Sequence, residues 1–140
     1  MPANVEGCNV AAAPAAVTTV AGLEALPGGM TVTDVCTADA ALNVTHIDVA
    51  NGSCPIVITR TYTVTDACAN SVNIIHIINV DDNTSPAIAG LLTASTVEGC
   101  SIASAPAAAA TVAALEALPG GVAISDACTP DASLIVSHID

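Results

Sequence analysis

The sequence repeats itself at a fixed offset of 92 residues. The motif VEGC at 5–8 recurs at 97–100, and the similarity continues without a gap. Residues 5–48 and 97–140 are identical at 29 of 44 aligned positions. A period near 90 residues is too long for a solenoid, whose repeats have about 20–50 residues. It suits a chain of small β-sandwich domains, one per repeat.

The repeat predicts the domain organisation. Residues 1–92 form one complete repeat, and residues 93–140 form the first half of a second copy. The end of the complete repeat, residues 81–92, begins with Asp-Asp-Asn and is predicted to be an acidic linker into the next copy.

Residues 54–80 carry the clearest secondary-structure signal, a β-hairpin. In its first strand Ile56, Ile58, Tyr62 and Val64 alternate with Thr and Val residues, and a period of two is typical of a strand. The second strand, 71–80, continues the alternation. A hairpin is not stable alone in water, so its apolar face must be covered.

The rest of the repeat is predicted to hold short strands and one helix. Pro14 suits a first helical turn and Pro27 a stop, so a short helix is expected over 14–26. Strands are expected over 5–10, 30–33 and 42–50, with a turn at Asn51-Gly52. The fold class is therefore all-β, as tandem β-sandwich repeats with one short helix each.

Cysteines are expected to strengthen a thin core. The chain has no Trp and no Phe, and Tyr62 is its only aromatic residue. Small domains with such cores use staples, and six cysteines with no Cys-x-x-Cys motif favour disulfides in an extracellular setting over zinc. Sequence alone cannot fix their connectivity, but the repeat favours three pairs that leave no thiol over: Cys8–Cys36, Cys54–Cys68 and Cys100–Cys128.

Acidic residues gather at turns and at the linker. Oxygen ligands of this kind suit Ca²⁺, and an ion at the linker would stiffen it; the alternative is a solvated acidic turn with Asx caps. The candidate ligands are Asp81, Asp82, Asn83 and Glu98 around the linker, Asp66 in the hairpin turn, and Asp34 and Asp39 in the loop around Cys36.

The net charge of −12, with Arg60 as the only Lys or Arg residue, excludes the cationic surface that nucleic acids require. The most apolar stretch, 101–118, contains Pro106 and Glu116 and is not expected to span a membrane. Residues 1–4 lack the features of a secretory signal, so the chain is expected to be a piece of a longer exported protein.

Arg60 falls on the apolar face of its strand, between Ile58 and Tyr62. Either it lies at an edge and its guanidinium reaches water, or it is buried and paired with an acid such as Asp48. Asn43, Asn51 and Asn83 occupy Asn-x-Ser/Thr sequons and are candidate glycosylation sites.

No enzymatic activity is predicted. His46, His76 and His138 lie inside strand patterns, no nucleophile motif accompanies them, and the aromatic platforms that sugar-binding sites use are absent.

Residues 54–86 resemble the hyalin-repeat (HYR) modules of extracellular proteins. The resemblance rests on TYTVTDACANS at 61–71 and VDDNTSP at 80–86. Ala69 stands where the family usually has Gly, although Asn70 can adopt a left-handed conformation. The resemblance implies an immunoglobulin-like sandwich and a non-catalytic, cell-surface role.

The predicted function is structural. The chain is interpreted as a repeat segment of a stalk, fibre or filament, whose partners are neighbouring repeats or copies of itself joined by strand addition or end to end. The alternatives are an adhesin module that binds a surface glycan or protein, and an accessory repeat of a carbohydrate-active enzyme.

Overall fold

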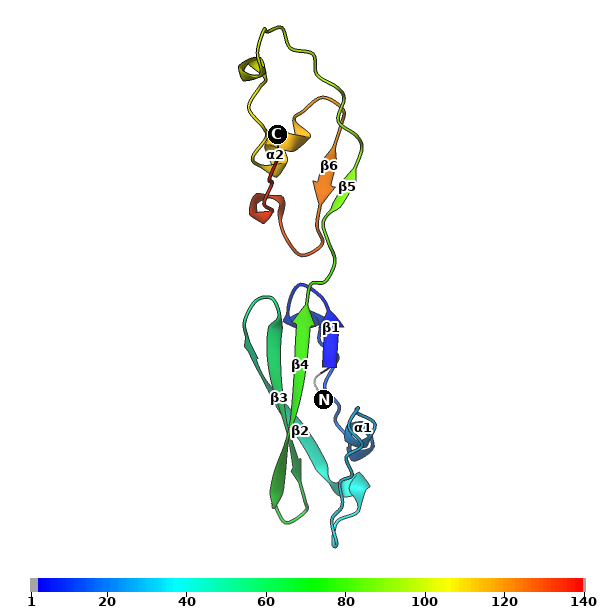
Figure 1. Cartoon of the computed structure of the whole chain (residues 1–140). Coiled ribbons are helices and arrows are strands. Elements are labelled where there is room, and N and C mark those ends of the chain that lie inside the picture. The colour runs from blue at the N-terminus through cyan, green and yellow to red at the C-terminus, as the bar shows by residue number, and fades with distance from the viewer. Residues whose placement is uncertain (1–2, 140) are drawn as a thin grey trace. The chain divides into compact units, whose positions relative to one another are not determined.

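The computed structural model describes residues 3–139. The chain divides into two compact units, residues 1–82 and residues 83–140, which are described separately below. Figure 1 shows their secondary structure. The division places residues 83–92, predicted as the linker that ends the first repeat, in the second unit.

A four-stranded sheet forms the first unit, with the strand order β1-β4-β3-β2. Strand β1 pairs with β4 in parallel, and the other pairs are antiparallel. The strands are β1 (Ala3–Glu6), β2 (Asn43–Asn51), β3 (Ile56–Thr65) and β4 (Ser71–Asp81).

The predicted hairpin is confirmed as β3 and β4. Alternate residues of β3 are buried, and they include Ile58, Tyr62 and Val64 as predicted. Tyr62 and Val64 pack with Val20 and Leu23, while Ile58 packs with Ile78 and Val80 in a second cluster.

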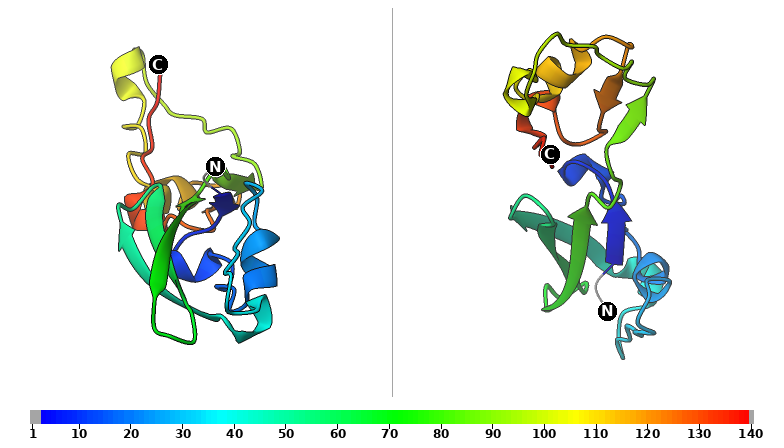
Figure 2. Two further views of the ribbon diagram at one scale, coloured as in Figure 1. Left: turned by 90° about the horizontal axis from the view of Figure 1, so that it is seen from below. Right: turned by 45° about the horizontal axis from the view of Figure 1, so that its top comes forward.

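The N-terminal segment and α1 cover one face of this sheet, as the left view of Figure 2 shows. Two 3₁₀ turns flank the helix α1 (Val20–Glu24): η1 (Val10–Ala12) precedes it and η2 (Asp39–Ala41) follows it. The other face is less covered, and Ile47 and Ile75 are 72% and 66% exposed. The predominantly β character is as predicted.

The predicted helix over 14–26 was too long, because α1 begins only after Thr19. The Thr19 hydroxyl accepts a hydrogen bond from Gly22 N–H at 3.1 Å, the bond of an N-cap. Before it, the Arg60 guanidinium donates to Pro14 O and Val17 N–H donates to the Tyr62 hydroxyl. Contacts with the sheet therefore replace helical hydrogen bonds over 14–18.

The second unit contains the same short elements at the same offset of 92 residues. They are η3 (Ile102–Ser104), α2 (Val112–Glu116) and η4 (Asp131–Ser133). Residues 95–98 and 135–139, the copies of β1 and most of β2, are not strands here. In the first unit β1 and β2 pair with the hairpin, and the described residues contain no copy of it.

Two strands are present only in the second unit. They are β5 (Ala87–Ala89) and β6 (Ala123–Ser125), and they pair with each other in an antiparallel two-stranded sheet. The segment that corresponds to β6 in the first unit, residues 31–33, was predicted to be a strand and is not one. A strand needs a hydrogen-bonded neighbour, and within the described residues only the second unit places one beside this segment.

Candidate functional site

The pairing of β5 with β6 is the first candidate site. Ala87 lies opposite Ser125, Ile88 opposite Ile124, and Ala89 opposite Ala123. The Ile124 N–H points the other way and donates to Glu116 Oε1 of α2 at 2.8 Å. The hydrogen bonds to β5 therefore fall to residues 123 and 125, as the alternation of an antiparallel ladder requires.

A close backbone contact continues this pairing beyond β5. Thr93 donates to Pro119 O twice, from its N–H at 2.9 Å and from its hydroxyl at 3.0 Å. Gly120 has a φ of +130°, and a Cβ there would collide with Leu91 O. Only glycine fits that position, so residues 86–93 are held along the whole of residues 119–125.

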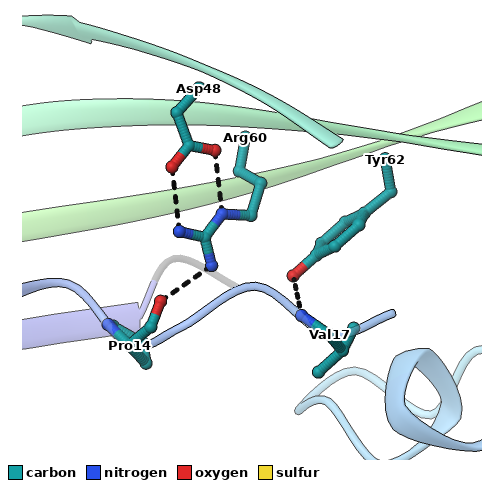
Figure 3. A network of polar contacts seen from close by, with 5 residues as sticks. All are labelled: Pro14, Val17, Asp48, Arg60 and Tyr62. Atoms are coloured by element: carbon teal, nitrogen blue, oxygen red, sulfur yellow. Dashed lines mark hydrogen bonds and ion pairs between the residues drawn. The ribbon is translucent and has the colours of Figure 1, made fainter. Parts of the chain in front are cut away.

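The second candidate site is an ion pair in the first unit between the buried Arg60 and the exposed Asp48, drawn in Figure 3. Arg60 is 5% exposed. Its Nε lies 2.8 Å from Asp48 Oδ1, its Nη2 lies 2.9 Å from Asp48 Oδ2, and its Nη1 donates to Pro14 O at 2.8 Å. Of the two alternatives for Arg60, the paired one is confirmed. The two contacts with Asp48 join β3 to β2, and the contact with Pro14 ties the N-terminal segment to β3.

The pair shifts the ionisation of both partners. The hydrogen bond from Arg60 lowers the pKa of Asp48, and the hydrogen bond to Asp48 raises the pKa of Arg60. His76 lies opposite Arg60 on β4, and its buried Nδ1 has no hydrogen-bond partner within residues 3–139. Burial, and next the charge of Arg60, lower the pKa of His76. The ion pair and the contact with Pro14 hold β2, β3 and the N-terminal segment together.

Asp66 and Asp34 form Asx turns that cap their own loops. Asp66 Oδ1 accepts from the backbone N–H groups of Cys68 and Asn70, each at 2.8 Å, and Oδ2 accepts from the Asn70 side chain. These bonds, the Asn70 side chain first, lower the pKa of Asp66. Asp34 Oδ1 accepts from the N–H groups of Cys36 and Thr37.

The second repeat copies the Asp34 turn. Asp126 Oδ1 accepts from Cys128 N–H at 2.9 Å and from Thr129 N–H at 2.7 Å. The first of these bonds contributes most to lowering the pKa of Asp126. The acids of these loops thus already have a role in local structure.

The predicted calcium ligands do not form one group. Asp34 and Asp66 line the same hollow of about 190 Å³ at one end of the first unit's sheet. Asp81 lies at the far end of β4, about 33 Å along the strand. Asp39 is the first residue of η2, and Asp82, Asn83 and Glu98 lie outside the strands. Among the described residues, no three His, Cys, Asp or Glu side chains form a group that could hold a metal ion.

The three predicted disulfides are not formed, since Cys36, Cys54, Cys68 and Cys100 carry free thiols. Cys8 and Cys128 are not among these free thiols. The prediction paired cysteines by repeat position and ignored the sheet. Cys54 and Cys68 lie at opposite ends of the ten-residue strand β3, but a disulfide needs Cα atoms within about 7 Å.

Cys8 and Cys36 are separated in the same way. Cys8 follows Gly7, whose N–H donates to Asp81 O at one end of β4. Cys36 belongs to the Asp34 loop beside Asp66 at the other end. Cys36 and Cys68 therefore lie at the same end of the sheet. Each lies two residues after the aspartate of an Asx turn, Asp34 or Asp66.

The remaining candidate residues lie on the surface or in strands. Asn43, Asn51 and Asn83 are exposed, and Asn43 and Asn51 begin and end β2. His46 and His138 are exposed. Within residues 3–139, no helix has the length and apolar character needed to cross a membrane.

Comparisons of the chain with family models, with curated proteins and with solved structures find no match. The resemblance to HYR modules, and the functions that it implies, therefore stay predictions.

Proposed function

We propose that the chain is a structural segment of an extracellular protein, in which immunoglobulin-like repeats follow one another to build a stalk or filament. The observation that carries the proposal is the pairing of β5 with β6. Residues 87–89 lie near the end of the first repeat in sequence, yet they pair with residues 123–125 of the second. Successive repeats that share a strand in this way are mechanically coupled, because pulling them apart must break the ladder.

The strands that each unit contains support the proposal of a sandwich, because each unit holds only part of the two sheets. Among the described residues, the first unit has the four-stranded sheet but no strand paired with residues 31–33, and the second has the β5–β6 sheet but no hairpin. Because α1 and α2 occupy equivalent positions, a complete repeat would carry both sheets around one helix. The clamp of Arg60 and Asp48 would then stiffen the first repeat.

Calcium is a secondary part of the proposal. The acidic run Asp81-Asp82-Asn83 lies where the chain passes from one unit to the next, and oxygen ligands there suit Ca²⁺. A melting temperature that rises with Ca²⁺ and falls with a chelator would support it. A melting temperature insensitive to both would exclude it.

Electron microscopy of the native material tests the structural role. Regular filaments or long stalks are expected. Isolated globular particles that bind a surface glycan or protein would contradict the proposal and favour the adhesin alternative.

A further inference from the structure

We propose that residues 27–33 of the first unit form an acceptor edge for the closing segment, residues 86–93, of a second copy of this chain. The inference rests on the proposed structural role, because it names the surface through which copies join. In the second unit the equivalent edge, residues 119–125, is already occupied by residues 86–93 of the same chain. The second unit therefore shows that residues 86–93 fit an edge of this sequence.

The acceptor edge keeps the features that hold the closing segment in the second unit. Val32 N–H donates to Glu24 Oε1 at 3.0 Å, as Ile124 N–H donates to Glu116. The backbone groups of residues 31 and 33 are thereby turned away from the helix, like those of residues 123 and 125. Pro27 and Gly28 repeat Pro119 and Gly120.

The space for the occupant is open. Gly28 has a φ of +134°, close to that of Gly120, but a Cβ there would meet no atom within 4 Å. The equivalent position of Gly120 is filled by the backbone of residues 91–93. The first unit thus repeats the glycine, and no described segment packs against it.

Two hollows lie beside the acceptor edge, and apolar side chains form part of the lining of each. One, of about 290 Å³, lies between Leu26 to Met30 and residues of β3 and β4, among them Tyr62 and Ile74. The other, of about 190 Å³, lies between Val32 and residues of the hairpin, among them Val64 and Val72. Val72 is 58% exposed, so apolar surface is available there.

The first unit is the better acceptor for this segment. In the second unit Ile88 is 70% exposed and Leu91 82%, and Ile88 lines a hollow with Leu115, the copy of Leu23. In the first unit the hairpin packs against Leu23. Transfer of residues 86–93 to the first unit of a second copy would therefore keep the ladder and bury more of Ile88. Since burial of apolar surface is favourable, repeated transfer yields a head-to-tail assembly.

The test combines a peptide with the full chain. A synthetic peptide of residues 83–93 is added to the ¹⁵N-labelled chain, and the amide signals are followed by NMR. We expect shifts at Thr31, Thr33 and residues 72–77, and at least tenfold weaker binding by the peptide with Ile88→Asp. Sedimentation of the full chain should show a mass that grows with concentration, and the variants Ile88→Asp and Val72→Asp should stay monomeric. Circular dichroism verifies that both variants are folded.

Each outcome is decisive. No shift at Thr31 and Thr33 would overturn the acceptor edge. Peptide binding without any concentration-dependent mass would overturn the second copy as the source of the strand, because the edge then serves only repeats of one continuous chain. Neither result touches the proposed function, which fails only if the native material contains no stalks or filaments.

Discussion

Ile88 lies directly opposite Ile124 in the pair of β5 and β6, whereas Val32, which takes the place of Ile124 in the first repeat, has no strand opposite it within residues 3–139. The same local sequence is thus a strand in one copy and irregular in the other. The difference lies in the neighbour, because a short strand is stable only when its backbone groups are paired. The end of one repeat is therefore a structural part of the next.

The hairpin turn contains a residue, Ala69, whose replacement by glycine should stabilise the fold. Ala69, which stands where the HYR family usually has Gly, has a φ of +67° and adopts the left-handed conformation. An L-residue there costs about 1 kcal/mol more than glycine. Ala69→Gly should raise the free energy of unfolding by about 0.5–1 kcal/mol, measured by urea denaturation. The control Ala67→Gly, in the same turn but outside the left-handed region, should have no stabilising effect.

The clamp between Arg60 and Asp48 should be costly to break. Asp48→Asn leaves the guanidinium buried without its charge partner, and we expect a loss of about 2 kcal/mol. The exposed control Asp39→Asn should change stability by less than about 0.5 kcal/mol. Equal effects of the two substitutions would show that the clamp contributes nothing.

The same pair predicts acid sensitivity. The pKa of Asp48 is lower in the folded chain, so its contribution is present above its unfolded pKa of about 3.9 and is lost as the pH falls through the folded value. The unfolding free energy, measured between pH 7 and pH 2, should fall below about pH 4. This fall should be smaller in the variant Asp48→Asn. If the variant and the natural chain had the same pH profile, Asp48 would not be the cause of the acid sensitivity.

His76 predicts a second pH dependence at a higher range. Its folded pKa is lowered, so protonation favours the unfolded chain once the pH falls below the unfolded value of about 6.5. His76→Leu also removes the unpaired Nδ1. The variant should therefore gain stability over the natural chain, by about 1 kcal/mol, and the gain should be larger at pH 5 than at pH 8 in thermal unfolding. A gain independent of pH would exclude titration of His76 as its cause.

The positions of the cysteines predict which bridges can form. With oxidised glutathione as the oxidant, two thiols exchange with its disulfide and release reduced glutathione. Within the first unit we expect a bridge between Cys36 and Cys68, which share one end of the sheet. Cys54 and Cys68, at opposite ends of β3, should not be joined. Peptide mapping without reduction distinguishes them, and a peptide that links Cys54 to Cys68 would refute the geometry.

The sequence was sufficient for features that depend on local pattern. The alternation of Ile58, Tyr62 and Val64 predicted the hairpin and its buried face correctly. The sequence repeat predicted that the helix of the first repeat would recur in the second, as α1 and α2 do. The start of α1 was not predictable, because Tyr62 and Arg60, far away in sequence, hold residues 14–17 in an extended form. The cysteine pairs failed for a similar reason, since repeat position says nothing about which end of a sheet a residue reaches.

Amide hydrogen exchange of the dilute, monomeric chain tests the central claim most directly. It compares two matched pairs of residues, Thr31 with Ala123 and Thr33 with Ser125, which occupy equivalent positions in the two repeats. If the closing segment of one repeat belongs to the next, Ala123 and Ser125 should exchange about tenfold more slowly than Thr31 and Thr33, because only they are paired with β5. Equal exchange within both pairs would contradict the account.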